Sequence, residues 1–235
     1  MTAAVDPGSE PAAALRGLSS MATKPLFTDL AAADVPGMPA LVVESSGGVE
    51  IAQRIRDGEA ADLVILADDA VAALAADGLA GEPRPLFRSE VVVAVPAGGE
   101  PPAIGTVDEL RVAIDAAAAI GYSTGPSGTA LRRLLDIWGL DVTDRLVQAR
   151  PGVPVARLLA DGAADLGFQQ RSELDGAPGV TVLGPMPPGA EIVTTFSGAV
   201  LASAAQPEAA VAALVVLAGP AVAEIVRANG MEPAG

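Results

Sequence analysis

The chain of 235 residues contains no cysteine and no histidine, and both absences limit its chemistry. Without cysteine it forms no disulfide and has no thiol nucleophile, so cysteine usage says nothing about its redox compartment. Zinc and other soft metals prefer ligands from these two residue types, and the remaining oxygen ligands show no EF-hand spacing. The sequence therefore predicts neither a metal site nor a cofactor.

Aromatic residues make up only 3% of the chain, so Ala, Val, Leu and Ile must build its core. The length suffices for a real core, in one large domain or in two small lobes. The formal net charge of −15 argues against nucleic acid or an anionic membrane as a partner. A small anion can still bind, because local amides and a few cations decide its affinity.

The amino terminus and the apolar runs lack the marks of export and of membrane insertion. Residues 1–11 carry Asp6 and Glu10, with neither the basic patch nor the apolar stretch of a signal peptide. The longest apolar run, 209–218, is about half of what a membrane span requires. We therefore expect a soluble cytoplasmic protein, although a chain trimmed of its leader, periplasmic or extracellular, would look similar.

Apolar runs of strand length alternate with segments that have helical spacing or helix caps, which favours sheets flanked by helices. The predicted strands are 14–18, 40–44, 63–66, 90–95, 118–122, 146–149, 164–168, 179–183 and 191–202. The predicted helices are 23–33, 48–57, 68–76, 106–116, 155–160, 207–217 and 220–229, together with one that starts after Ser127 and keeps its apolar spacing through Trp138. Thr106 and Glu109 have the spacing of a capping box.

A stretch rich in Pro and Gly, 96–102, interrupts this succession and indicates a crossing between two lobes. The predicted fold class is α/β, with two lobes joined by two crossover strands near 92–95 and 194–198. The predicted division is a disordered amino terminus, 1–13, then lobe one, 14–95 and 196–235, and lobe two, 96–195. A cleft between such lobes is lined by the loops that follow strands.

One of these loops, within 118–135, joins a buried strand to an amphipathic helix through small hydroxylated residues and glycines. Ser127 is the predicted N-cap of that helix, whose first-turn amides stay free. Such a helix terminus is a natural anion site, and the chain repeats the arrangement near Ser19 and Ser46. An ordinary capped helix explains any one loop alone, whereas three together indicate a binding site.

The same loop fits the G-x-S-x-G pattern of a serine hydrolase at 121–125. That chemistry needs a base to take the serine proton, normally a histidine oriented by a carboxylate. The chain has no histidine, and a Ser–Lys variant would depend on its single lysine, Lys24. A serine hydrolase is therefore the least favoured interpretation.

Motifs along nearly the whole chain resemble the type II periplasmic solute-binding proteins, in the molybdate-binding branch that also includes aconitate isomerase. They are Leu-Ser-Ser (18–20), Glu-Ser-Ser-Gly-Gly (44–48), 55–66, 88–95, Ile-Gly-Tyr-Ser and Pro-Ser-Gly within 120–128, 162–174, Gly-Pro-Met-Pro (184–187) and Asn-Gly-Met-Glu-Pro (229–233). The resemblance implies a periplasmic-binding-protein-like fold and an anionic ligand. It does not by itself imply transport.

The strand-end loops and this resemblance together give the expected ligand-binding residues. They are Ser19, Ser20, Met21, Ser46, Gly47, Arg88, Ser123, Thr124, Ser127, Gly128, Phe168 and Gln169, with Gln170 beside them. Simple helix capping could account for the serines, and Arg88 could instead pair with a carboxylate such as Glu90. Glu173 is expected to act in helix capping.

Two functions from different classes remain open. The first is a binding protein that holds a small oxyanion or carboxylate through Ser and Thr hydroxyls and backbone amides. The second is an isomerase, similar to aconitate isomerase, that moves a proton on a small organic acid, with Lys24 and Tyr122 as candidate catalytic residues. The expected partner is a small anionic ligand, and components of an ABC importer become partners only if the chain is exported.

Overall fold

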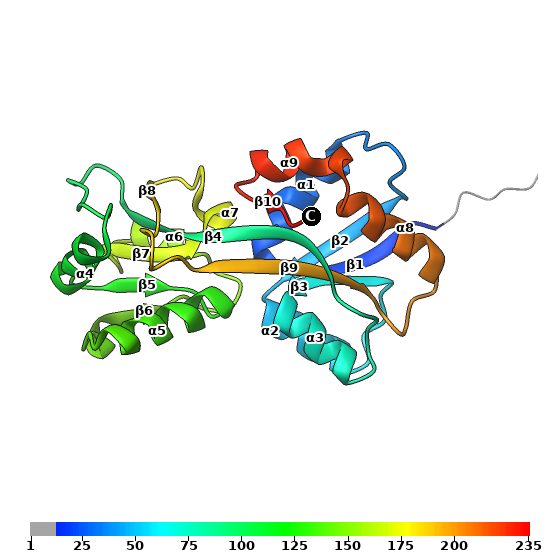
Figure 1. The fold of residues 1–235 in the computed structure, drawn as a ribbon, viewed down its shortest axis with the longest axis horizontal. Coiled ribbons are helices and arrows are strands. Elements are labelled where there is room, and N and C mark those ends of the chain that lie inside the picture. The colour runs from blue at the N-terminus through cyan, green and yellow to red at the C-terminus, as the bar shows by residue number, and fades with distance from the viewer. Residues whose placement is uncertain (1–12) are drawn as a thin grey trace, which may run out of the picture.

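The computed structural model describes residues 13–235. These residues form alternating strands and helices, which are arranged in two α/β lobes (Figure 1). The predicted two-lobed α/β architecture is confirmed. The predicted disorder of 1–13 lies, apart from Ala13, outside the described residues. The figure shows β4 and β9 as two long strands that run side by side between the lobes.

The first lobe is a mixed sheet with helices on both faces. Its strands are ordered β2-β1-β3-β9-β4, and β10 pairs with the other side of β4. Its elements are β1 (Leu15–Ser20), η1 (Met21–Thr23), α1 (Lys24–Ala32), β2 (Leu41–Ser46), α2 (Gly48–Arg56), β3 (Leu63–Ala67), α3 (Asp68–Ala76), β4 (Arg84–Pro96), β9 (Val193–Val200), α8 (Pro207–Leu217), η3 (Pro220–Val222), α9 (Ala223–Ala228) and β10 (Glu232–Pro233).

The second lobe is built around the other half of β4, which pairs with β7 on one side and β8 on the other. Beyond β7 the strands β5 and β6 continue the sheet in parallel. Its further elements are α4 (Val107–Ala116), β5 (Ile120–Tyr122), α5 (Pro126–Trp138), η2 (Thr143–Arg145), β6 (Leu146–Gln148), α6 (Val155–Ala160), β7 (Leu166–Gln170), α7 (Arg171–Leu174) and β8 (Val180–Pro185).

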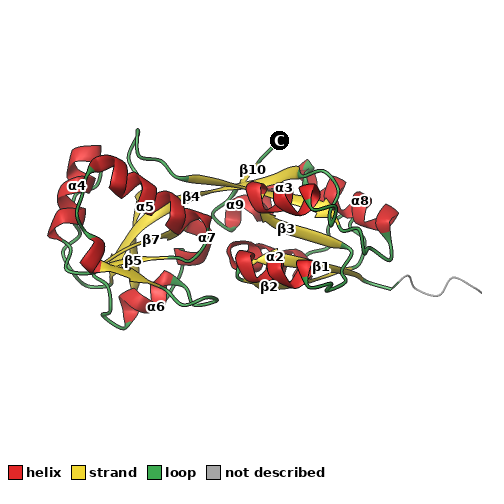
Figure 2. Cartoon of the chain, turned by 90° about the horizontal axis from the view of Figure 1, so that it is seen from below, coloured by secondary structure: helices red, strands yellow, loops and turns green. Residues whose placement is uncertain are grey.

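Strand β4 belongs to both sheets, and it changes partners between Glu90 and Val91. Residues 84–90 pair with β9, whereas 91–96 pair with β7 and β8. The strand pairing can therefore be followed without a break from β2 to β6. The apolar cores remain separate on the two sides of this point, so the chain has two lobes rather than one large sheet (Figure 2).

Burial on both faces explains why the strands show continuous apolar runs instead of alternation. In β4 the side chains of Val91, Val93 and Val95 pack with α4 and α5, while Val92 and Ala94 pack with α6 and α7. In β3 alternate residues likewise pack against the helices of opposite faces. Each sheet therefore contributes to two apolar layers, which suits a chain rich in Val, Leu and Ala.

The ends of the helices and strands can be compared with three predictions made from the sequence. The capping box of Thr106 and Glu109 is confirmed, with both of its hydrogen bonds present. The prediction of Ser127 as N-cap of α5 is wrong, because Gly125 is the N-cap and Pro126 begins the helix. Strand β4 starts at Arg84, earlier than predicted, because backbone pairing with β9 extends the strand through Pro85.

Within residues 13–235 no single helix is both long and apolar enough to cross a bilayer. Helix α8 and the helical segment Pro220–Ala228, which comprises η3 and α9, reach the necessary length and composition only as a pair, which is bent by 62° at its break. Much of α8 packs in the core of the first lobe, through Ala210, Ala213, Leu214 and Leu217.

Candidate functional site

A cavity of about 690 Å³ lies between the lobes, and segments that follow strands form most of its lining. From the first lobe they are residues 20–22 at the end of β1, 47–49 after β2, and 66, 67, 69 and 70 at the end of β3. From the second lobe they are 123–127 after β5, 152–154 before α6, and 169, 170 and 173 at the end of β7. The crossing strand β9 adds Thr194 and Phe196.

Parallel pairing explains why these loops meet. In the first lobe β1 pairs in parallel with β2 and β3, and Ser20 lies opposite Ser46 in the register. In the second lobe β5 pairs in parallel with β6 and β7. Because parallel strands end at the same edge of a sheet, the loops at their carboxyl ends gather there, and the two edges face the cavity.

Two helices from opposite lobes begin at this cavity with no side chain capping them. The N-caps of α2 and α5 are Gly47 and Gly125, and neither makes a side-chain cap hydrogen bond within the described residues. The first amides of a helix lack intrahelical partners, and the helix dipole favours negative charge near them. The first turn of α5 carries no acidic residue, whereas that of α2 carries Glu50.

Serine hydroxyls add hydrogen-bonding groups from both lobes. The Oγ atom of Ser20 is buried among the lining residues and has no partner in the described part of the chain. Ser123 and Ser127 approach each other across the first turn of α5, with 2.9 Å between their Oγ atoms. A buried hydroxyl without a partner is costly, so the geometry at Ser20 favours a bound polar group.

Two glutamines at the end of β7 are held in fixed orientations. The Oε1 atom of Gln169 accepts a hydrogen bond of 2.6 Å from the backbone N–H of Val155. The Nε2 atom of Gln170 donates one of 2.6 Å to the hydroxyl of Thr194 on the crossing strand. The Oε1 atom of Gln170 is buried and has no partner within residues 13–235.

Four charged residues line the cavity, and they differ in exposure. Arg56, Asp69 and Arg133 are exposed, whereas Glu173 in α7 is half-buried. Burial raises the pKa of Glu173 to about 7, and a hydrogen bond from the Gln169 side chain opposes this shift. Among residues 13–235 no three carboxylates come close enough together to hold a metal ion.

Seven of the predicted binding residues line this cavity: Ser20, Met21, Gly47, Ser123, Thr124, Ser127 and Gln169. They come from both lobes and from three strand-end loops. Gln170, which the resemblance also implied, lies beside them in the lining. The sequence-based idea of converging loops therefore selects residues that the fold does bring together.

Five other predicted binding residues are not among the lining residues. The hydroxyl of Ser19 is buried 2.7 Å from that of Ser45, and Ser46 donates a hydrogen bond to Glu50. Phe168 packs in the core of the second lobe, and Gly128 lies buried in the first turn of α5. Arg88 is exposed on β4 opposite Glu232, and the carboxylate of Glu90 pairs with Arg171 instead.

Neither predicted catalytic residue lines the cavity. Lys24 is exposed at the start of α1. Tyr122 is buried in the core of the second lobe, with 6% of its surface exposed. Four residues that the sequence did not predict as binding residues do line the cavity: Glu173, which was expected to act in helix capping, and Thr194, Arg56 and Arg133. The position of Glu173 just after a strand-end Gln pair is the signal that could have identified it.

A family model described as bacterial extracellular solute-binding protein matches residues 15–232. The aconitate isomerase of a Pseudomonas species is 35% identical over 188 residues, which are 78% of this chain and 71% of that protein.

Two solved structures share the fold. The periplasmic molybdate-binding protein of Azotobacter vinelandii superposes with a TM-score of 0.76 and 22% identity, covering 92% of this chain and 98% of that one. The sulfate-binding protein of Mycobacterium tuberculosis superposes with a TM-score of 0.75 and 16% identity, covering 94% and 87% of the two chains. At these identities the likeness establishes the fold alone.

Proposed function

Since the chain belongs to the family of bacterial extracellular solute-binding proteins, we propose that it binds a small oxyanion or carboxylate between its lobes. Membership confirms the resemblance that the sequence motifs predicted. One observation carries the proposal: helices α2 and α5 begin at one cavity from opposite lobes, beside the unpartnered hydroxyl of Ser20. Amides and hydroxyls arranged in this way donate hydrogen bonds to an anion.

The negative net charge of −15 does not oppose this binding, because the local surroundings of the cavity differ from the whole surface. Arg56 and Arg133 lie at its exposed part, one from each lobe. Arg56 is paired with Asp77 at 3.0 Å, whereas Arg133 can interact with a carboxylate of the ligand. The volume of about 690 Å³ falls within the usual range for small-molecule sites. Both features suit an organic acid with more than one carboxylate.

Calorimetry with molybdate, sulfate, cis-aconitate and trans-aconitate tests this proposal. We expect one of these anions to bind with one molecule per chain. Substitution Ser20→Ala should then weaken binding by about 10- to 100-fold, since a hydrogen bond to a charged group contributes roughly 1.5–3 kcal/mol. Binding of none of the four anions would contradict the proposal.

Ser46→Ala is the matched control for that experiment. It also removes one serine hydroxyl at a strand end, and Ser46 lies opposite Ser20 in the pairing of β1 with β2. Its hydroxyl donates to Glu50, however, and Ser46 is not among the lining residues. We expect Ser46→Ala to keep the wild-type affinity, and an equal loss in both variants would move the site away from Ser20.

An isomerase is the second candidate function, and the half-buried carboxyl of Glu173 in the cavity is the observation that favours it. The similarity to an aconitate isomerase supports the same class, a proton shift on a small organic acid. A chain that only binds needs no group that exchanges protons near neutral pH. A chain that moves protons does need one.

A further inference from the structure

We propose that Glu173 is the acid–base residue of the cavity and moves a proton between two carbon atoms of a bound unsaturated carboxylic acid. This inference rests on the isomerase form of the proposed function, and it adds the group that carries the proton. Sequence reasoning had assigned that part to Lys24 and Tyr122, neither of which lines the cavity.

The place of Glu173 in the fold is where the two lobes meet. It belongs to α7, which follows β7 directly and packs on β4, β7, β8 and α6. The same short helix contacts η1 of the first lobe, the segment that follows Ser20. Its carboxyl group therefore shares one cavity with the free amides and the unpartnered hydroxyl that would hold the carboxylates of a ligand.

The neighbouring Gln169 is buried, and its side chain is held in one orientation. The Oε1 atom of Gln169 is occupied by the backbone N–H of Val155 at 2.6 Å, and Gln169 is only 2% exposed. Its amide nitrogen is therefore the atom that remains to donate to Glu173, and this donation lowers the pKa of Glu173 against the effect of burial. The cavity therefore places a buried and oriented amide donor beside the carboxyl group, an arrangement that suits acid–base catalysis.

The proton affinity of Glu173 agrees with this geometry. Burial raises its pKa to about 7, so both protonation states are populated near neutral pH. The charged residues on α7 and on the elements packed against it are Arg171, Asp175, Arg84, Arg88, Glu90, Arg157 and, just after η1, Lys24. Several of these are paired with each other or with neighbours: Arg171 with Glu90 and Asp175, and Arg157 with Asp161.

The step balances without any further reactant. The ionised carboxylate of Glu173 takes a proton from a carbon next to the double bond, and the electron pair of that C–H bond spreads through the double bond into a ligand carboxylate. Glu173 then returns the proton to the other end of the allylic system, so the double bond has moved and Glu173 is ionised again. Helix-terminal amides stabilise the charge that develops on the ligand.

Proton NMR in deuterium oxide tests the proposal, with trans-aconitate as the probe. We expect the wild type to exchange deuterium into the probe, and Glu173→Gln to lower the exchange rate by about 100- to 10,000-fold. Calorimetry should show that the variant still binds the probe. The matched control is Asp175→Asn, which removes a carboxylate beside the same helix but outside the cavity lining, and it should exchange at the wild-type rate.

Each outcome decides the inference. The role of Glu173 is overturned if Glu173→Gln exchanges deuterium at the wild-type rate, or if the wild type binds the probe without any exchange. Either result leaves the proposed binding function in place. No binding of any tested anion overturns the proposed function as well. If Glu173→Gln does not fold, the wild-type pH profile decides: the exchange rate should rise as the pH passes about 7, and a flat profile overturns the inference.

Discussion

At the scale of single residues, Gly128 supports the candidate site although it does not line the cavity. It lies in the first turn of α5, and a Cβ atom there would clash with the carbonyl oxygen of Ser123. Only glycine lets this helix approach the loop that presents Ser123, Thr124 and Gly125 to the cavity. The sequence placed Gly128 among ligand residues, whereas the structure gives it a steric function.

Substitution Gly128→Ala is therefore expected to displace the loop and to lower both stability and ligand affinity. Overpacking of this kind costs about 1–3 kcal/mol of unfolding free energy, which a thermal melt detects. The matched control is Gly125→Ala, where the nearest atom to the added Cβ is 3.9 Å away and the φ of −83° suits any residue. Equal melting temperatures for the two variants would contradict the steric argument.

A second residue-scale prediction concerns the dependence of stability on pH at Glu173. Burial on folding raises its pKa from the ordinary value of 4.5 to about 7, so the folded protein binds this proton more tightly than the unfolded chain. Stability should therefore fall as the pH rises between these values, by at most about 3 kcal/mol. The variant Glu173→Gln cannot titrate at this position and should not lose stability in this way. The difference in melting temperature, variant minus wild type, should therefore increase from pH 5 to pH 8. A constant difference would show that Glu173 does not titrate in this range.

The types and positions of residues in the sequence predicted only part of the candidate site. Serines and glycines after strands are visible in the sequence, and seven of the expected residues do line the cavity. Which hydroxyl of a loop is already occupied depends on tertiary neighbours, as the pairs Ser19–Ser45 and Ser46–Glu50 show. The burial that distinguishes Glu173 from other carboxylates arises from packing between elements, which no local pattern reveals.

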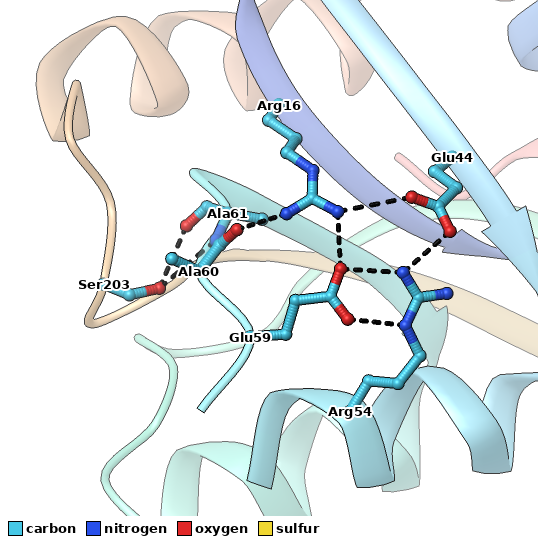
Figure 3. A network of polar contacts seen from close by, with 7 residues as sticks. All are labelled: Arg16, Glu44, Arg54, Glu59, Ala60, Ala61 and Ser203. Carbon is cyan, nitrogen blue, oxygen red and sulfur yellow. Dashed lines mark hydrogen bonds and ion pairs between the residues drawn. The ribbon is translucent and has the colours of Figure 1, made fainter. Parts of the chain in front are cut away.

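At the scale of elements, an ion-pair network ties α2 to the sheet of the first lobe (Figure 3). Arg54 on α2 and Arg16 on β1 both bind Glu59, and both also reach Glu44 on β2. Hydrogen bonds from Arg54 first, and then Arg16, lower the pKa of Glu59 to about 2. The network fixes the far end of the helix whose N-terminus begins at the cavity.

The network predicts an acid- and salt-sensitive stability. Since folding lowers the pKa of Glu59, its contribution to stability is present above the ordinary pKa of 4.5 and is lost as the pH falls toward about 2. Thermal melts should show Glu59→Gln less stable than wild type at pH 7 in low salt, with the difference shrinking in 1 M salt.

Asp161→Asn provides the comparison, because it breaks an exposed pair with Arg157 that has no second partner among the described contacts. Isolated surface pairs contribute little, so this variant should melt close to wild type at every salt concentration. A larger effect at Asp161 than at Glu59 would contradict the importance given to the network.

Elements were predicted well where periodicity and capping are local, as for α4 with its capping box. The start of β4 was missed because Arg84 and Pro85 lack strand character, and pairing with β9 alone makes them a strand. The start of α5 was misjudged because Pro126, fixed in a helical φ, takes the first helical position and leaves Gly125 as the N-cap.

At the scale of the whole molecule, one strand determines the arrangement of the lobes. Strand β4 leaves the first sheet after Glu90 and enters the second at Val91, and β9 runs beside its first half. The sequence indicated two lobes through the order of its elements. The predicted crossover strands near 92–95 and 194–198 correspond to β4 and β9. The prediction of a crossing at 96–102 is wrong, because β4 changes sheets at Glu90 and Val91 and the Pro- and Gly-rich stretch follows it in the second lobe.

The central claim is that a small anion binds between the lobes and contacts both of them. Amide NMR spectra of the isotope-labelled chain, recorded during titrations with molybdate and with trans-aconitate, test this most directly. We predict that one of these anions shifts amide signals of residues 20–22 and 47–49 in one lobe together with 123–127 and 169–173 in the other. Shifts confined to a single lobe, or spread over residues away from the cavity, would contradict the account.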